Sequence, residues 1–236
     1  MFLNLYHEGI YRPLLNLLIY VYNVLPGHDI GIVIILLTLL IRLLLAPSFH
    51  KSLKSQSDMN ALQPKLAELK EKHKDDKEGQ AKAMMDLYKE NKINPLSSCL
   101  PLLIQLPILI ALYQVFQKTL GGSVEGLYTF VQNPGTINPY FLGLINLSKP
   151  SLAFGVIAGL AQFWQSKITM PSTPNQDSTA KIMAMQTTYV LPFVSAFIAL
   201  RLPAGLPLYW IITTLFAVGQ QYYIMRQRKL PVVISN

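Results

Sequence analysis

The apolar positions of this chain gather in five long stretches that are separated by polar segments. The stretches are residues 30–47, 96–117, 151–166, 182–200 and 204–225. A helix that crosses a membrane needs about 20 predominantly apolar residues, and lipid forces its backbone groups to pair within the segment. Each stretch is therefore predicted to form a transmembrane helix. Only Arg201, Leu202 and Pro203 separate the last two stretches, which predicts a tight antiparallel hairpin.

The N-terminal stretch, residues 2–23, is apolar but is interrupted by Glu8, Arg12 and Pro13. This mixture favours an amphipathic helix that lies at the membrane interface. A sixth transmembrane helix is the alternative, because the stretch is long enough to span. A cleaved signal peptide is disfavoured, since the acidic Glu8 comes before the first basic residue.

Residues 48–94 form the one sizeable polar segment between apolar stretches. Leu62, Leu66 and Leu69 follow the spacing of one helical face, and a polar turn ending at Gly79 comes after them. A second helix follows, with Met84, Leu87 and Tyr88 on one face. The segment is therefore predicted to be a helical hairpin. Its methionines either present an adaptable apolar surface to other proteins or pack the two helices together.

Lysine and arginine are distributed unevenly about the apolar stretches. Of the 20 basic residues, 15 follow the first, third or fifth stretch, and only four lie on the opposite side. Basic residues concentrate on the cytoplasmic side of membrane proteins, so the N-terminus is predicted outside and the C-terminus in the cytoplasm. The formal net charge of +8 then reflects membrane topology, and no nucleic-acid partner is expected.

These patterns together predict an all-α, polytopic membrane protein with five transmembrane helices, an interfacial N-terminal helix and a cytoplasmic hairpin. The expected segments are an outer-face helix (1–24), transmembrane helix 1 (29–47), the cytoplasmic hairpin (48–94), transmembrane helix 2 (95–118), an outer loop (119–150), transmembrane helix 3 (151–167), a cytoplasmic loop (168–180), transmembrane helix 4 (181–201), transmembrane helix 5 (204–225) and a basic cytoplasmic tail (226–236).

Arg42 is the one charged side chain inside an apolar stretch, and none of the five stretches contains Asp or Glu. A cation in lipid is costly, by at least ~3 kcal/mol on insertion scales, so Arg42 has to meet water, carbonyls or phosphate. Thr38 lies one turn earlier on the same face. This pattern indicates a wet cavity that reaches in from the cytoplasm. The alternative is an arginine that snorkels to the inner head groups.

Three other stretches carry polar faces that are able to line such a cavity. The residues are Ser98 and Gln105 in the second stretch, Gln162, Gln165 and Ser166 in the third, and Tyr209, Trp210, Thr213 and Gln220 in the fifth. Hydrogen bonding between helices explains any single one of these residues. Together with the face of the first stretch that carries Thr38, four stretches have polar faces. Four such faces beside one unpaired arginine favour a hydrophilic groove.

Catalytic and metal chemistry find little support in the sequence. His7, His28, His50 and His73 lie outside the apolar stretches and far apart, and Cys99 is the single cysteine. Motifs for zinc proteases, serine hydrolases and phosphate loops are absent from the sequence. We therefore expect no metal, no cofactor and no enzymatic activity.

Several short motifs give the chain a family resemblance. They are LQPKL at 62–66, LYKEN at 87–91, NPL at 94–96 running into CLPLLIQLP at 99–107, and LPAGLPLYW at 202–210. On these motifs, and on the order of its elements, the chain resembles the YidC-type membrane protein insertases. It differs from common members in lacking a large periplasmic domain with an extra first span, and an upstream lipoprotein signal.

The resemblance implies a groove open to cytoplasm and lipid, with one positive charge on the first core helix. Arg42 matches that charge, Gln105 and Trp210 match groove residues, and either Gln165 or Gln162 matches a glutamine of the third helix. It further implies a bacterial inner membrane location and insertion of nascent membrane proteins. The lipid bilayer, a transiently bound ribosome and the Sec translocon are the other implied partners.

Two other function classes are compatible with the composition. One is a small-solute transporter or channel with Arg42 as an anion site, although the halves of the chain show no repeat of the kind common in transporters. The other is a structural scaffold for membrane complexes. Insertion of a short single-span client by the purified protein in liposomes distinguishes an insertase from both.

The charge asymmetry gives a direct test of topology. In a Cys99→Ser background, we expect Glu125→Cys to react with a membrane-impermeant thiol reagent added outside, and Asp76→Cys to react only after the membrane is opened. Labelling of intact and permeabilised cells measures this. The reverse pattern would overturn the predicted orientation.

Overall fold

The computed structural model of the chain describes residues 2–94, 97, 100–122, 124–169, 182 and 185–228, and at 2, 101, 102, 227 and 228 the backbone only. Most of the described chain is helical, so the all-α class is confirmed. The helices are α1 (Phe2–Tyr6), a π-helical turn η1 (His7–Tyr11), α2 (Arg12–Val24), α3 (Ile30–Ala61), α4 (Gln63–Lys72), α5 (Lys77–Glu90), α6 (Leu100–Leu120), α7 (Leu152–Thr169), a second π-helical turn η3 (Gln186–Val190), α9 (Leu191–Ala199) and α10 (Gly205–Arg228).

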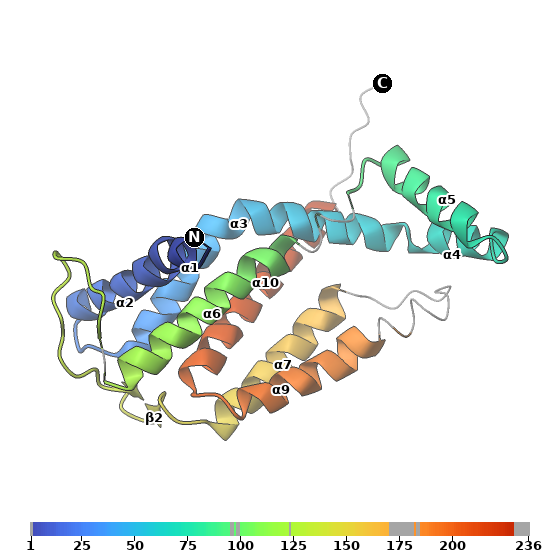
Figure 1. Cartoon of the computed structure of the whole chain (residues 1–236). Coiled ribbons are helices and arrows are strands. Elements are labelled where there is room, and N and C mark those ends of the chain that lie inside the picture. Colours follow the sequence, from blue (N-terminus) through green and yellow to red (C-terminus); the bar gives the residue numbers. More distant parts are fainter. Residues whose placement is uncertain are drawn as a thin grey trace.

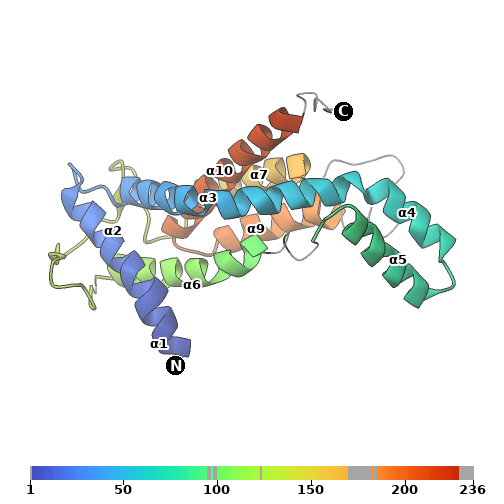
Figure 2. The same cartoon turned by 90° about the horizontal axis from the view of Figure 1, so that it is seen from above.

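Five helices, α3, α6, α7, α9 and α10, run along the length of an elongated bundle (Figure 1). The α10 helix packs against both α3 and α7, and α7 also packs against α9. The hairpin of α4 and α5 projects from one end of the bundle, while α2 and the 121–151 connection lie at the other end (Figures 1 and 2).

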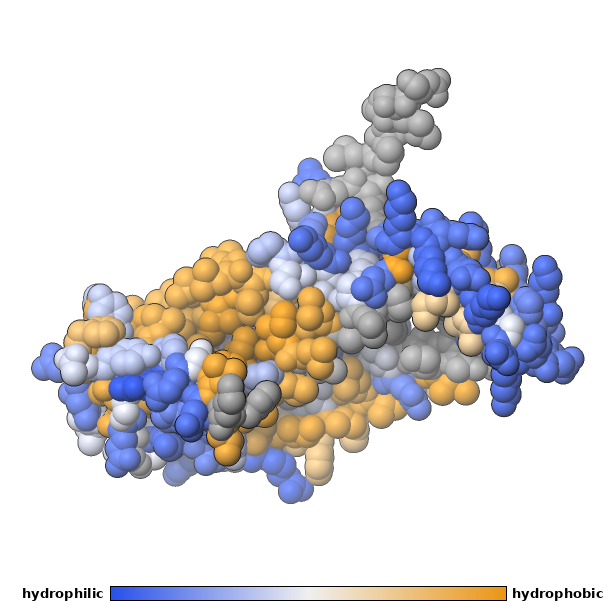
Figure 3. Space-filling view, turned by 45° about the horizontal axis from the view of Figure 1, so that its top comes forward, coloured by the Kyte–Doolittle hydropathy of each residue, from blue (hydrophilic) through white to orange (hydrophobic). Residues whose placement is uncertain are grey.

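The distribution of apolar surface agrees with a membrane protein. Figure 3 shows an apolar band over the middle of the molecule and hydrophilic surface at the hairpin end and at the opposite end. By length and composition, α3 and the Leu103–Leu120 part of α6 are able to cross a membrane, and Gln186–Ala199 is a shorter apolar helix. Membrane crossing by the other predicted stretches stays a prediction.

Helix α3 is longer than the sequence predicts. Pro47 was expected to end the first transmembrane helix, but α3 continues through this proline to Ala61. A proline inside a helix removes one backbone hydrogen bond and favours a kink, so its position is usually taken as a boundary. The first part of the segment 48–94 is therefore an extension of α3, and the hairpin proper comprises only α4 and α5.

The return from the hairpin is fastened to α3. The Ser52 hydroxyl donates to the Ser97 carbonyl at 2.7 Å, and the Ser55 hydroxyl donates to the Asn94 carbonyl at 3.3 Å. Within the hairpin, Leu62 and Leu66 are buried as the predicted apolar face requires. Burial also raises the pKa of the Tyr88 hydroxyl above its usual value, with Lys70 opposing the change.

The connection between α6 and α7 holds the ends of several helices together. Its two-residue strands, β1 (Tyr140–Phe141) and β2 (Ile145–Asn146), pair in an antiparallel arrangement that the sequence pattern does not indicate. The Asp29 carboxylate caps α3 by accepting from the Gly31 N–H at 2.8 Å, and it also accepts from the Leu142 N–H at 2.6 Å. The same carboxylate thus starts α3 and fixes the turn after β1.

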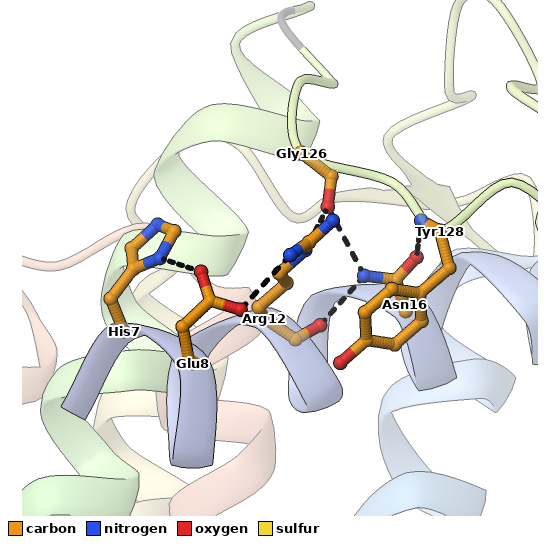
Figure 4. Close-up of polar contacts among 6 residues, drawn as sticks. All are labelled: His7, Glu8, Arg12, Asn16, Gly126 and Tyr128. Atoms are coloured by element: carbon orange, nitrogen blue, oxygen red, sulfur yellow. Dashed lines mark hydrogen bonds and ion pairs between the residues drawn. The ribbon is translucent and has the colours of Figure 1, made fainter. Parts of the chain in front are cut away.

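The N-terminal helix is bonded to the same connection (Figure 4). Arg12 donates to the Gly126 carbonyl at 3.1 Å and to Glu8 at 2.9 Å, and its guanidinium carbon lies 4.8 Å from the centre of the Tyr128 ring. The buried Asn16 accepts from the Tyr128 N–H at 2.6 Å. Hydrogen bonds from Arg12 and, less strongly, His7 lower the pKa of Glu8.

These contacts show that one face of the predicted amphipathic helix packs on the protein. Tyr11, Leu15 and Tyr22 are buried in the core, whereas Leu3 and Leu5 near the N-terminus are 81% and 70% exposed. Placement of the exposed end at a membrane interface remains a prediction.

Two glycines allow α7 and α9 to approach closely. A Cβ atom added at Gly159 would lie 2.7 Å from the Ala196 Cβ, and one added at Gly155 would lie 2.5 Å from a Leu200 methyl group. Small residues four apart are a common means of close helix packing in membranes. The contact between α7 and α9 therefore depends on the absence of side chains at these positions.

We expect Gly159→Ala to destabilise the protein by roughly 1–3 kcal/mol, because the Ala196 Cβ is fixed to its backbone and cannot move aside. Thermal unfolding of the purified protein in detergent measures the effect. Gly219→Ala is the matched control, since no atom lies within 4 Å of the added Cβ and alanine favours the helix. Equal stability of the two variants would contradict the packing argument.

Candidate functional site

Arg42 lies inside the helix bundle at one end of a chain of polar side chains that joins three helices through Gln105. Its side chain is only 6% exposed, and its Nη2 donates to the Gln105 Oε1 on α6 at 3.3 Å. The Gln105 Nε2 in turn donates to the Tyr209 hydroxyl on α10. A snorkelling arginine would extend toward water, whereas this guanidinium is held by a side chain of a neighbouring helix.

The second contact of Arg42 is an aromatic ring that the sequence analysis missed. The guanidinium carbon lies 4.5 Å from the centre of the Phe49 ring, in the geometry of a cation–π interaction. Phe49 follows Arg42 by seven residues on α3 and is buried. Residues seven apart lie on the same face of a helix, two turns from each other. This spacing is the signal in the sequence that could have indicated the pair.

The charge of Arg42 is not neutralised by a carboxylate. Among the described residues, none of the ion pairs includes Arg42. Amide oxygens and ring faces stabilise a guanidinium without cancelling its charge. The site therefore keeps a net positive charge inside the bundle.

Thr38 is one turn before Arg42 and is 1% exposed. Its hydroxyl donates to the Ile34 carbonyl of the same helix at 2.6 Å. The hydroxyl proton is thus used within α3, and Thr38 offers a ligand only the acceptor lone pairs of its oxygen.

A second polar contact joins α7 to α10. The Trp210 Nε1 donates to the Gln162 Oε1 at 3.3 Å. Gln165 is half-buried one turn later, and its backbone carbonyl accepts from the Thr169 hydroxyl at 2.8 Å. A hydrogen bond therefore joins Gln162 to the α10 residue next to Tyr209, and among the described side chains no such bond joins Gln165 to α10.

Several buried polar atoms near these contacts have no hydrogen-bond partner among the described residues. They are the Thr213 Oγ1, the Ser166 Oγ, and the Oε1 atoms of Gln220 and Gln221. An unsatisfied buried polar atom costs about 1–3 kcal/mol, so each such atom favours water or a polar ligand group. The sequence analysis predicts that Thr213, Ser166 and Gln220 line a cavity, and Ser98 of the same prediction lies outside the described residues.

The arrangement is suited to binding. It offers one fixed positive charge, neutral amides, hydroxyls and an indole. Within the described chain, no group of three or more His, Cys, Asp or Glu side chains is placed to hold a metal ion. The chemistry available at Arg42 is therefore attraction of negative charge and hydrogen bonding.

Comparison with known proteins places this architecture in a family. The model of the 60Kd inner membrane protein family matches residues 20–230, which include every helix from α3 to α10. The chain belongs to this family.

Curated relatives in the family carry the name membrane protein insertase YidC. The relatives from Pelobacter propionicus and Geotalea uraniireducens are 38% and 39% identical over 226 and 215 residues, in each case 90% of this chain. The relative from Magnetococcus marinus is 38% identical over 218 residues, 92% of this chain. The chain spans only 38%, 37% and 35% of the lengths of these three relatives.

The chain of contacts at Arg42 predicts a measurable contribution to stability. We expect Gln105→Leu to destabilise the protein by about 1.5–3 kcal/mol, because the buried guanidinium loses its hydrogen-bond acceptor. Tyr209→Phe leaves the Arg42–Gln105 contact in place and should have a smaller effect, of about 0.5–1.5 kcal/mol.

The same helix supplies a control pair for this measurement. The exposed Gln117 donates to the Tyr113 hydroxyl at 2.7 Å, so Gln117→Leu removes a glutamine–tyrosine bond away from Arg42. Unfolding in detergent should show little change for this variant. An equal loss for Gln105→Leu and Gln117→Leu would mean that the Arg42 contact adds nothing to stability.

Proposed function

We propose that this chain inserts newly made membrane proteins into a bilayer and assists their folding. The observation that carries the proposal is the buried Arg42, which is bonded to a neutral amide and has no carboxylate partner in the described chain. Membership in the 60Kd inner membrane protein family and the names of the curated relatives support it.

The proposed site is a hydrophilic groove that opens to the cytoplasm and to lipid. Its wall comprises Arg42 and Thr38 of α3, Gln105 of α6, Gln162 and Gln165 of α7, and Tyr209, Trp210 and Thr213 of α10. The unsatisfied Thr213 hydroxyl and the positive charge both favour water at this position.

The physical task of the groove is to shorten the apolar distance that a polar segment has to cross. Polar groups lose hydration free energy when they enter hydrocarbon. A client's outer segment would remain partly hydrated in the groove, with its acidic residues attracted to Arg42. The client's hydrophobic helix would then move sideways into lipid, and burial of its apolar surface would drive the step.

The proposed placement puts the N-terminus outside, the hairpin of α4 and α5 in the cytoplasm, and five helices across a bacterial inner membrane. Nascent membrane proteins would meet the hairpin first, because it projects from the bundle (Figure 2). A transient ribosome contact and cooperation with the Sec translocon belong to the same proposal.

A transporter or channel is the less favoured function. The comparisons align the chain with proteins that are named insertases. The halves of the chain also show no repeat of the kind common in transporters.

Substitutions of Arg42 test the role of its charge. We expect Arg42→Lys to retain most insertion activity, Arg42→Ala to lower it several-fold, and Arg42→Glu to lower it most, because a carboxylate repels acidic client segments. The measurement is the insertion yield into proteoliposomes for two clients that differ only in acidic residues of the outer segment. The loss should be larger for the acidic client.

The exposed Arg201, whose guanidinium carbon lies 4.8 Å from the centre of the Phe197 ring, is the matched control cation. Arg201→Ala should leave both yields unchanged at equal amounts of folded protein. Equal losses for the two clients with Arg42→Ala would refute charge attraction, and unchanged yields would remove Arg42 from the proposed site.

A further inference from the structure

A pocket of ≈ 540 Å³ lies between α3 and α10, away from the Gln105 contact. Its walls come from Ala46, Pro47 and His50 of α3 and from Phe216, Gly219, Gln220 and Tyr223 of α10. Helix α6, which supplies Gln105 to the Arg42 site, contributes no residue to this pocket. The volume lies within the range of about 300–1,000 Å³ that small-molecule sites occupy.

The pocket forms because α10 diverges from α3 and because small residues line it. Figure 2 shows the C-terminal part of α10 leaving the bundle at an angle to α3. No atom lies within 4 Å of a Cβ built at Gly219, so the wall of α10 is open at that position. Ala46 lines the facing wall on α3, where its carbonyl accepts from the Gln220 Nε2 at 3.5 Å.

The lining is apolar in one part and polar in another. Ala46, Pro47 and Phe216 offer a hydrocarbon surface, and His50, Gln220 and Tyr223 add polar groups. The buried Gln220 Oε1 has no hydrogen-bond partner among the described residues, so the wall presents an acceptor. A ligand that fits this lining has both an alkyl part and a polar part with hydrogen-bond donors.

On both α3 and α10, a basic residue comes shortly after the residues that line the pocket. Both α3 and α10 run from the outer end of the bundle toward the basic end, so residues after His50 and Tyr223 lie beyond the pocket mouth. The exposed Lys54 is one turn after His50, and the exposed Arg226 is three residues after Tyr223. Neither takes part in an ion pair with a carboxylate of the described chain.

We infer that this pocket binds an anionic phospholipid of the cytoplasmic leaflet, with an acyl chain against Phe216 and the head group at Lys54 and Arg226. Basic pockets between transmembrane helices on the cytoplasmic side are suited to anionic head groups. The glycerol head group of phosphatidylglycerol also carries hydroxyl donors, which makes it the chosen probe. The inference rests on the membrane orientation of the proposed function and does not require insertion activity.

The test measures lipid retention by the full chain in a neutral detergent. Native mass spectrometry follows titration with phosphatidylglycerol, with phosphatidylcholine and with soluble glycerol phosphate in separate samples. We expect a one-to-one complex with phosphatidylglycerol, at least tenfold weaker binding of phosphatidylcholine, and no displacement by glycerol phosphate. Equal retention of both lipids, or displacement by glycerol phosphate, would overturn the assignment.

A Cβ atom added at Gly219 meets no atom within 4 Å, and leucine favours a helix more than glycine does, so we expect Gly219→Leu to fold and to occupy part of the pocket. We expect it to reduce phosphatidylglycerol binding at least tenfold, whereas Gly9→Leu, at another glycine with no atom within 4 Å of an added Cβ, should bind as the parent does. Unchanged binding by Gly219→Leu would place the lipid elsewhere and overturn the inference.

Charge variants provide an independent measurement. Each basic residue near a membrane surface adds about 1 kcal/mol, so Lys54→Gln or Arg226→Gln should weaken binding about fivefold and the double variant roughly 25-fold. Lys72→Gln in the hairpin is the control and should have no effect. A protein dimer that Gly219→Leu dissociates would show that a second copy occupies the pocket, which also overturns the lipid assignment.

Discussion

A guanidinium inside an apolar helix bundle requires acceptors and ring faces from its neighbours, and Arg42 obtains them from two helices. Phe49 of α3 and Gln105 of α6 contact it, and Gln105 extends the chain to Tyr209 of α10. Each partner stabilises the cation without neutralising it. The positions of α3, α6 and α10 around this charge are therefore linked, and the rest of the proposed groove depends on that linkage.

Much of this fold follows from the chain's own pattern. Long apolar stretches predicted the helices, and the spacing of Leu62 and Leu66 predicted a buried face in the hairpin. The solitary charge of Arg42 among apolar residues likewise indicates the candidate site. These signals are local, because they depend on helical periodicity and on the cost of an ionised group in hydrocarbon.

Other features depend on contacts between distant parts of the chain and could not be derived from local patterns. Gln162 and Trp210 are 48 residues apart, and only the packing of α7 against α10 brings them within hydrogen-bond distance. The continuation of α3 through Pro47 was missed because proline usually marks a boundary. Two-residue strands are also too short to give a period-two pattern.

The two ends of the bundle are fastened to different degrees. At the end of the bundle where α2 lies, the Asp29 carboxylate accepts from the Leu142 N–H, and the Ala204 and Gly205 N–H groups donate to the carbonyls of Lys149 and Leu147. At the other end α10 diverges from α3. If α10 tilts, it would turn about its anchored N-terminal end. The displacement of each residue would then grow in proportion to its distance from that end. For 24 residues at 1.5 Å per residue, a tilt of about 5° moves the far end by roughly 3 Å while the anchored turn stays in place.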